Sequence, residues 1–470
     1  MEQGSTMMSS TGTTTSRRGR RAARILAIAA TVMTTALVAT GCSAGGGGDS
    51  NTIKIAYQKF GTFTQLDAHL KEVKKTFEKA NPGMTVQLEP IAAQNDDYYT
   101  KLALMERAPS TAPDVIYEDT FKVKADAEAG YLLSLDKYTA KWADWSKFYD
   151  NAKEAGVGTD GKTYGIPMGT DTRALWYNKD LFKKAGLTVP WEPKNWDDVL
   201  SAAKTIKSKL PDVVPLNVYS GKPQGEGSTM QGFEMLLYGT PNGTLYDDAS
   251  KKWITGSSNF TDSLGFIKDV YQGGVGPTPE QALDTNISTV VGGDWLPKGK
   301  LAIDLDGSWL SGTWLSTGTN PWPEWSKVMG QVGMPTQNGE APGVNSMSGG
   351  WTLAVGATSK NPDKAFDFIA DALDKDGSMS YDIAASQIAV RSDVATDPDY
   401  ADSNPSFKFF SSLVKDTHFR PATTDYSQIS NQITVAMEAV MTGQQTPEEA
   451  AKAYDTALTG IVGADKTVSK

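Results

Sequence analysis

The sequence predicts an α/β fold in which helices cover a parallel sheet, and the part of the chain before residue 120 carries the observations that predict it. Residues 52–57 and 84–88 both alternate apolar and polar side chains, as strands with one buried face do. Residues 66–81, which lie between them, place apolar side chains at helical spacing. A further helix-like stretch leads to a third strand-like run at 113–117. Strands that alternate with helices favour parallel pairing.

The later part of the chain continues this pattern. We expect further strands at 301–305 and 351–355, and helices at 199–210, 263–271 and 361–373. The last hundred residues are expected to be helical. One helix there should begin at Thr446, because Thr-Pro-Glu-Glu combines a capping residue, a proline at the first turn and acidic residues after it.

The chain starts with the features of an exported protein. Residues 17–24 hold five arginines, and the uncharged run that follows, 25–39, is only about fifteen residues long. A helix of that length is too short to cross a bilayer, which needs roughly twenty residues. We therefore predict that residues 1–41 are a signal peptide, with Sec and twin-arginine export both open.

The chain has one cysteine, Cys42, and it follows the small residues Ala39, Thr40 and Gly41. This pattern resembles the lipobox of bacterial lipoproteins. The resemblance implies that Cys42 becomes the first mature residue and carries fatty acyl chains such as palmitate, which anchor the protein to the outer face of the cell membrane. The alternative is a thiol without a role in a cleaved leader. Residues 42–51 are rich in Gly and Ser, which predicts a flexible tether after the lipidated cysteine.

Composition argues against several classes of function. The formal charge is −10, and five arginines and one glutamate give residues 1–41 a charge of +4, which leaves −14 for the rest. A mature chain with this large a negative charge is not expected to bind nucleic acid. The only histidines are His69 and His418, which argues against histidine-based catalysis and multi-histidine metal sites, and we predict neither a metal nor a cofactor. Twelve tryptophans suit the apolar faces of sugar rings.

Polar residues follow two of the predicted strands at their carboxyl ends, where α/β sheets bind ligands. The first loop offers Gln58, Lys59 and Phe60, and the third strand is followed by Glu118 and Asp119. These five residues are candidate ligand contacts. The alternative for Asp119 is that it caps the helix that follows.

Four stretches together resemble the extracellular solute-binding proteins of bacterial ABC sugar importers, the family that includes maltose-binding protein. They are YGIPMGTDTRALWYNKDLFKKAGL at 164–187 with PKNWDDVL at 193–200, GKLAIDLDGSWLSGTW at 299–314, SMSGGWTLAVGATSKNPDKAFDFI at 346–369, and RPATTDY with GQQTPEEAAKAYDTAL within 420–458. They occur in the order of the family and span nearly the whole mature chain.

The resemblance implies a type II periplasmic-binding-protein fold, with two α/β lobes joined by a hinge around an interlobe cleft. The hinge would cross near 169–174, 347–351 and 391–395. The N-terminal lobe would then comprise 52–168 and 350–393, and the C-terminal lobe 169–349 and 394–470.

The resemblance also implies a function. The protein would capture a sugar, expected to be an oligosaccharide, outside the cell and deliver it to ABC permease subunits in the membrane, acting as a monomer without catalysis. One alternative is a secreted glycoside hydrolase that uses Glu118 and Asp119 as its acid pair. Another is the same fold binding a different solute, such as a polyamine, a phosphate ester or a peptide.

Family position adds further candidate ligand contacts. Asp171 is the expected sugar-binding acid, although an ion pair with Arg173 is the alternative. Trp309 and Trp351 are the expected aromatic platforms, and the small residues Gly349 and Gly350 would let the backbone approach a ligand. The remaining candidates are Trp295, as a third platform, and the polar cluster of Arg420, Asp425 and Tyr426.

Overall fold

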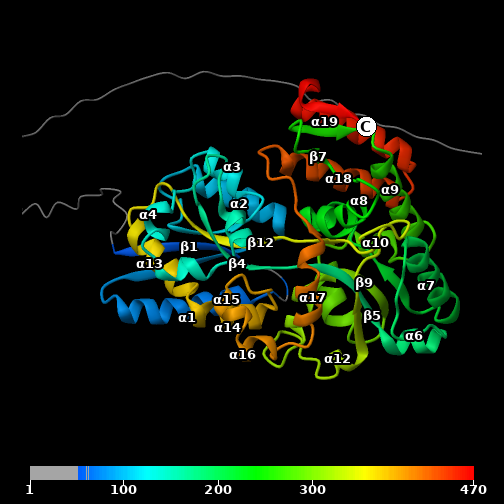
Figure 1. The fold of residues 1–470 in the computed structure, drawn as a ribbon, viewed down its shortest axis with the longest axis horizontal. Helices are drawn as coiled ribbons and strands as arrows, with labels where there is room; N and C mark the ends of the chain where they lie inside the picture. The colour runs from blue at the N-terminus through cyan, green and yellow to red at the C-terminus, as the bar shows by residue number, and fades with distance from the viewer. Residues whose placement is uncertain (1–50, 60, 62) are drawn as a thin grey trace, which may run out of the picture. The chain divides into compact units, whose positions relative to one another are not determined.

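The computed structural model describes residues 51–59, 61 and 63–470. The signal peptide, Cys42 and Phe60 lie outside the described residues. Within this range the chain forms two separate main sheets, each covered by helices (Figure 1). No helix among the described residues is both long enough and apolar enough to cross a bilayer.

The first sheet has the strand order β2-β1-β3-β12-β4. Its strands are β1 (Thr52–Lys59), β2 (Thr85–Ala92), β3 (Val115–Asp119), β4 (Gly165–Thr170) and β12 (Gly350–Val355). β1 pairs in parallel with β2 and with β3, as expected, whereas β12 runs antiparallel to both β3 and β4. The parallel pairing expected of the first three strands is confirmed, and the sheet as a whole is mixed because a strand from far along the chain inserts between β3 and β4.

Four helices pack beside the first sheet: α1 (Gln65–Ala80), α2 (Asn95–Glu106), α13 (Pro362–Ala372) and α14 (Lys375–Ala385). Their apolar faces and the inner residues of the strands form one core, to which Phe77 and Phe368 contribute an edge-to-face pair with ring centroids 5.5 Å apart. We call this sheet and its helices the N-lobe.

The second main sheet has the order β10-β5-β9-β6. Its strands are β5 (Arg173–Asn178), β6 (Val214–Asn217), β9 (Leu301–Gly307) and β10 (Met329–Val332). The helices packed with it include α7 (Trp196–Lys209), α9 (Ser258–Tyr271), α18 (Tyr426–Met441) and α19 (Pro447–Val462). We call this half the C-lobe.

Short elements complete the described chain. The helices are α3 (Val123–Glu128), α4 (Asp136–Thr139), α5 (Asp150–Lys153), α6 (Lys179–Ala185), α8 (Met235–Leu237), α10 (Pro279–Ala282), α11 (Ile287–Val290), α12 (Trp325–Val328), α15 (Ser392–Ala395), α16 (Pro398–Ala401) and α17 (Phe407–Ser412). The small strands are β7 (Tyr246–Asp247), β8 (Lys252–Thr255), β11 (Ser346–Met347), β13 (Thr417–His418) and β14 (Thr467–Ser469). Two of these, β13 and β14, interrupt the helical character expected of the last hundred residues.

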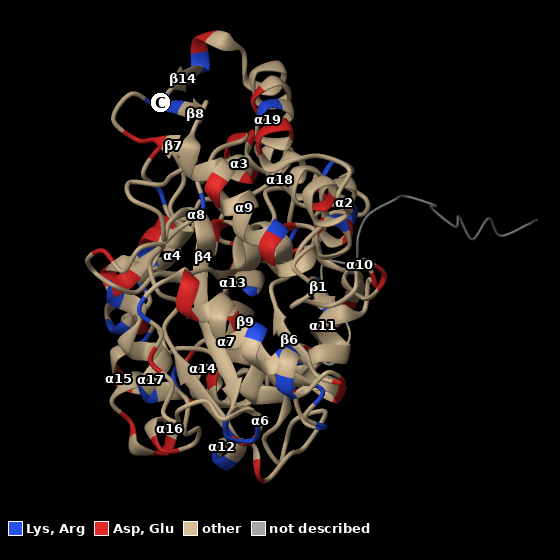
Figure 2. Cartoon of the chain, turned by 90° about the vertical axis from the view of Figure 1, so that its right-hand side faces the viewer, with Lys and Arg blue, Asp and Glu red and all other residues tan. Residues whose placement is uncertain are grey.

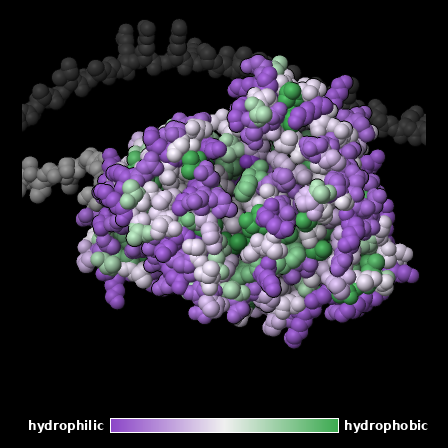
Figure 3. All heavy atoms as spheres, viewed as in Figure 1, coloured by the Kyte–Doolittle hydropathy of each residue, from purple (hydrophilic) through white to green (hydrophobic). Residues whose placement is uncertain are grey.

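Local sequence explains where two of the C-lobe helices begin. The Asn195 side chain accepts the backbone N–H of Asp198 and so caps α7, where the sequence reads PKNWDD. At α19, Thr446 and Glu449 form a reciprocal capping box, which confirms the helix start expected from the sequence. Lys and Arg are interspersed with Asp and Glu over the outer elements (Figure 2). The face in Figure 3 is mostly hydrophilic, with hydrophobic residues in small groups.

The chain passes between the two main sheets at three places. β4 leads directly into β5 through Asp171 and Thr172, and β11 leads into β12 through Ser348 and Gly349. The third passage is the segment from Ser386 to Ser406, which begins beside β4 with reciprocal backbone hydrogen bonds between Thr170 and Ile388. Two short strand-to-strand connections and one longer segment that contains α15 and α16 thus join the lobes, an arrangement that permits rotation about a common hinge.

Candidate functional site

A cavity of about 190 Å³ lies between the lobes, beside the hinge. Its walls contain eight of the sequence-predicted residues, and they come from both lobes and from the hinge itself. These residues are Gln58, Asp119, Asp171, Arg173, Trp309, Gly350, Trp351 and Arg420. A separate groove of about 1460 Å³ contains only Gly349 and Arg420 from the predicted set. We therefore place the candidate site in the smaller cavity.

Asp171 sits in the first hinge passage and is almost fully buried. Its Oδ1 accepts hydrogen bonds from Arg173 Nη1 and from the backbone N–H of Gly349, the latter at 2.9 Å. The ion pair with Arg173 that the sequence left as an alternative is thus present. It uses one carboxylate oxygen, and Oδ2 of Asp171 meets no donor among the described residues. Asp171 can therefore hold the hinge and still accept a hydrogen bond from a ligand.

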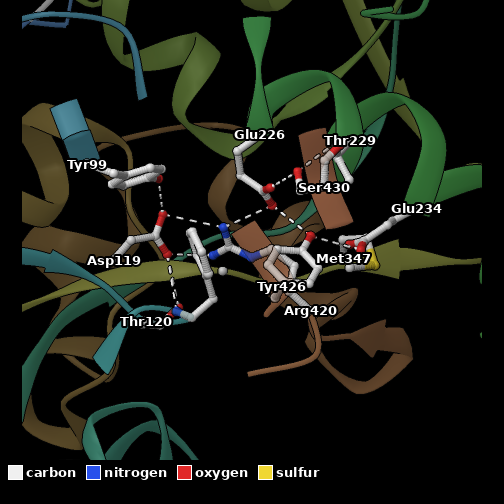
Figure 4. Close-up of polar contacts among 12 residues, drawn as sticks. Tyr99, Asp119, Thr120, Glu226, Thr229, Glu234, Met347, Arg420, Tyr426 and Ser430 are labelled. Carbon is white, nitrogen blue, oxygen red and sulfur yellow. Dashed lines mark hydrogen bonds and ion pairs between the residues drawn. The ribbon is translucent and has the colours of Figure 1, made fainter. Parts of the chain in front are cut away.

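Arg420 lies at the centre of a buried polar network (Figure 4). Its Nη2 lies 2.6 Å from Oδ1 of Asp119, at the end of β3, and its Nη1 lies 3.4 Å from Oε1 of Glu226. The hydroxyl of Tyr99 donates to Oδ2 of Asp119 at 2.8 Å. Because Asp119 belongs to the N-lobe and Glu226 to the C-lobe, one guanidinium connects the two lobes.

Two small strands, β11 and β13, hold Arg420 in the position from which it contacts both lobes. β13 pairs in parallel with the hinge strand β11, and the Ser348 N–H donates to the carbonyl of His418 at 2.9 Å. Arg420 follows two residues later. A Cβ at Gly349 would lie 3.2 Å from Nη2 of Arg420 and 3.6 Å from Oδ1 of Asp171. The glycine thus keeps room between the two charged groups.

Tyr426, the first residue of α18, lies between two buried carboxyl groups. Its hydroxyl is 2.8 Å from Oε1 of Glu226 and 2.9 Å from Oε1 of Glu234. A hydroxyl has one proton to donate, so one of these carboxyl groups must itself be protonated and donate to the tyrosine oxygen. Burial raises the pKa of Glu234 to about 8 and that of Glu226 to about 7. Glu234, which lies farther from Arg420, is the group that carries the proton.

The C-lobe wall contains a second acidic group, Asp306, near the end of β9. Its Oδ2 accepts the hydroxyl of Tyr219 at 3.0 Å and its Oδ1 accepts the N–H of Gly307 at 2.7 Å. Burial raises the pKa of Asp306 to about 6, so the carboxyl is mostly ionised at neutral pH.

Two tryptophans supply aromatic surface to the cavity, and each has one face covered by the protein. Tyr117 stacks on Trp351 with ring centroids 4.2 Å apart and planes 4° apart. The guanidinium carbon of Arg173 lies 4.8 Å from the ring centre of Trp309. Tyr99 also stacks on Trp351, with ring centroids 6.1 Å apart, and both tryptophans are half-buried in the cavity wall.

Gly307 explains the Gly-x-Trp pattern. A Cβ at this position would lie 2.0 Å from the ring of Trp309, so any other residue would displace the indole. Gly350 has a related role in the hinge, because its φ is +143° and a Cβ there would lie 2.6 Å from the carbonyl oxygen of Gly169. Both glycines permit close packing around the cavity.

The remaining predicted residues lie outside the cavity. Glu118 is fully buried on the opposite face of β3 from Asp119, since adjacent side chains of a strand alternate. Lys59 pairs with Asp67 of α1 at 2.8 Å. Trp295 packs in an apolar cluster with Trp314. The last two are Asp425, half-buried at the start of α18, and Tyr426, which reaches the site through Glu226.

Two acidic residues of the cavity wall were not among those predicted from the sequence. Asp306 stands at the carboxyl end of a predicted strand, and the rule that selected Gln58 and Asp119 would have found it. Glu226 lies in a loop between Gly225 and Gly227, with no periodic pattern around it. Only the flanking glycines signalled a special backbone there.

Comparison with known proteins bears on the family and the fold of the chain. The family model for bacterial extracellular solute-binding proteins matches residues 61–379. A putative binding protein of Brucella abortus (strain 2308) is 24% identical over 407 residues, which cover 86% of this chain and 92% of the relative. The arabinooligosaccharide-binding protein of Bacillus subtilis (strain 168) is 23% identical over 212 residues, 45% of this chain and 46% of the relative.

Solved structures share the two-lobed fold. The GacH receptor of Streptomyces glaucescens GLA.O, studied unliganded and in complex with acarbose, is 25% identical with a TM-score of 0.74, covering 87% of this chain and 98% of that one. An ABC transporter solute-binding protein of Thermotoga lettingae TMO bound with α-D-tagatose is 25% identical with a TM-score of 0.76, covering 88% and 100%. The expected two-lobed α/β fold is confirmed, and the chain belongs to the bacterial extracellular solute-binding protein family.

Proposed function

We propose that this chain captures a sugar in the cavity between its lobes and delivers it to the permease of an ABC transporter. One observation carries the proposal: both lobes contribute to a single cavity that combines carboxylates with two tryptophans. A sugar presents hydroxyl groups around a ring with an apolar face, and such walls match both features. The acarbose and tagatose complexes of the two similar proteins support it.

The hinge gives the capture a mechanism. A ligand that contacts Asp119 on one lobe and Trp309 on the other gains more interaction in a closed cleft than in an open one. It therefore shifts the equilibrium between the two states toward closure. The closed arrangement of the two lobes is the signal that a permease would recognise.

Within the proposed site, residues divide by what they would do. Asp119 and Asp171 accept sugar hydroxyls, with Gln58 and Asp306 as further polar contacts. The rings of Trp309 and Trp351 pack on apolar sugar faces. A second group of residues would hold these side chains in position. Its members are Arg173, Gly349, Gly350, Arg420 and Tyr426.

Thermal unfolding in the presence of carbohydrates tests the proposal. Binding to the native state alone stabilises it, by about 2.7 kcal/mol when the ligand concentration is one hundred times Kd. Asp171→Asn keeps an oxygen for the Gly349 N–H but removes the charge, and should weaken binding at least tenfold. Asp248→Asn is the control, because the Asp248 side chain is 90% exposed. A flat response to every carbohydrate would overturn the proposal.

The proposal is one of binding without reaction. Asp119 is held by Arg420, and Glu118 lies on the other face of the strand, so the pair does not converge on one bond as a glycosidase requires. Incubating the mature protein with glycans should produce no new reducing ends. Their appearance would favour the hydrolase.

We further propose that a lipid on Cys42 anchors the mature protein to the outer face of the membrane and that residues 43–51 are its tether. Cys42→Ala should release the protein into the medium, and mass spectrometry of the mature N-terminus should find the acyl groups on the wild type only. The released protein should be monomeric by light scattering. An unmodified Cys42 would contradict the anchor.

A further inference from the structure

We infer that the cavity takes one neutral sugar ring or a sugar alcohol of similar size, and excludes oligosaccharides and anionic sugars. The inference rests on the proposed function and narrows the substrate class. It replaces the oligosaccharide expected from the sequence with a smaller ligand. Three independent features carry it: the volume of the cavity, the contacts at one of its edges and the charge of its walls.

The volume of the cavity matches one ring. An apolar cavity of about 150 Å³ accommodates benzene, a ring of six heavy atoms. The present cavity, at about 190 Å³, leaves room for a ring of that size and part of its hydroxyl shell. Sites for larger, drug-sized ligands occupy roughly 300–1,000 Å³. A trisaccharide would need several times the space available.

Direct contacts between the lobes close one edge of this cavity, on the side of Gln94 and Asp96. The Gln94 amide, before α2, donates to the carbonyl of Thr285 at 2.9 Å. The N–H of Glu226 donates to Asp96 at 3.2 Å. A Cβ at Gly61, in the loop after β1, would lie 2.4 Å from Oγ1 of Thr289, so the Gly61 backbone lies close to the Thr289 side chain. A longer saccharide would have to separate these pairs.

The charged residues that line the cavity disfavour the binding of an anionic sugar. Four carboxyl groups, those of Asp119, Asp171, Glu226 and Asp306, line the cavity, against the two guanidinium groups of Arg173 and Arg420. Each guanidinium is already engaged, Arg173 with Asp171 and Arg420 with Asp119. A phosphate or uronate would therefore add a negative charge where no cation is uncommitted among these wall residues. Neutral hydroxyls, which donate to carboxylates, do not incur this cost.

Isothermal titration with a matched carbohydrate panel tests the inference. The panel contains neutral hexoses, pentoses and alditols, the disaccharide and trisaccharide of each hexose, and glucuronate and glucose 1-phosphate. We expect at least one neutral monosaccharide or alditol to bind, and its longer and anionic counterparts to bind at least tenfold more weakly. Tighter binding of a trisaccharide or of an anion would overturn the inference and leave the proposed function standing. No binding of any carbohydrate would overturn both.

A pair of variants tests whether the closed edge sets the size limit. Gln94→Ala removes an amide that bonds Thr285 across the lobes. Gln272→Ala is the control, because the Gln272 amide bonds the carbonyl of Val440 at 2.7 Å within the C-lobe and lies outside the cavity walls. We expect Gln94→Ala to raise disaccharide affinity relative to monosaccharide affinity at least threefold, and Gln272→Ala to leave the ratio unchanged. An unchanged ratio in Gln94→Ala would overturn the edge contact as the cause.

Discussion

Arg420 and Asp119 are separated by 301 positions in the sequence, yet Nη2 of the arginine lies 2.6 Å from Oδ1 of the aspartate. The pair joins the loop before α18 to the carboxyl end of β3, and both side chains are about 5% exposed. A buried pair of this kind contributes little net stability relative to apolar residues of the same shape, but the loss of one partner leaves an uncompensated charge. The Arg420–Asp119 pair therefore helps to fix the position of one lobe relative to the other.

Replacing Arg420 by methionine should strongly destabilise the protein. Asp119 and Glu226 would remain buried without their cation, and we expect the free energy of unfolding to fall by about 3–5 kcal/mol. Urea denaturation measures the change. Lys415→Met is the control, because the Lys415 side chain is 79% exposed and should change the free energy by less than about 1 kcal/mol. A similar small change in Arg420→Met would contradict the assigned role.

Gly307→Ala should displace Trp309 and so weaken sugar binding. The new methyl carbon would lie 2.0 Å from the indole, which must then move. We expect at least a tenfold rise in Kd by titration, comparable with that of Trp309→Ala. Gly265→Ala is the matched control, because a Cβ in that helical position of α9 contacts nothing within 4 Å and alanine favours helix by about 1 kcal/mol. Equal affinities for the two glycine variants would refute the explanation of the Gly-x-Trp pattern.

Stability should decrease as the pH rises from about 6.5 to 8. Burial raises the folded-state pKa of Glu226 to about 7 and those of Glu234 and Glu106 to about 8. In this interval the unfolded glutamates are already ionised while the folded ones still bind protons, so raising the pH favours the unfolded state. His69, whose pKa burial lowers to about 4, has the opposite effect only below its unfolded pKa near 6.5.

Chemical denaturation at a series of pH values measures this decrease. Glu234→Gln should reduce the slope, because the amide cannot titrate, whereas Glu280→Gln, at an exposed position of α10, should leave it unchanged. A free energy of unfolding that rises between pH 6.5 and 8 would show that these glutamates are ionised in the folded protein.

Thr446→Ala should lower the free energy of unfolding by about 1 kcal/mol, because the capping box at the start of α19 would lose its side-chain acceptor. Thermal unfolding followed by circular dichroism provides the measurement. Thr456→Ala, an exposed position within the same helix, should be neutral or slightly stabilising. A larger loss at Thr456 than at Thr446 would contradict the capping role.

The sequence by itself determined the local elements and the family. The strand-like runs correspond to β1, β2, β3, β9 and β12, and the helical spacing of apolar residues correctly predicted α1, α7, α9 and α13. These predictions succeed because the periodicity of a strand or a helix depends only on residues close together in the sequence. It also predicted that Asp119, Asp171, Trp309 and Trp351 belong to one site, and the structure places all four along one cavity. Their contact with a ligand stays a prediction.

Only the tertiary structure decided how distant segments meet. The insertion of β12 between β3 and β4 made the first sheet mixed, and no pattern near residue 350 specifies which strands it joins. The partners of Arg420 depend on β13 pairing with β11, a two-residue strand too short to leave a periodic signal, and Glu226 is held by Tyr426 and Ser430 of α18. The volume and the charge of the cavity depend on residues of both lobes. These residues lie far apart in the chain, so the spacing of apolar and polar residues within a short segment cannot predict either property.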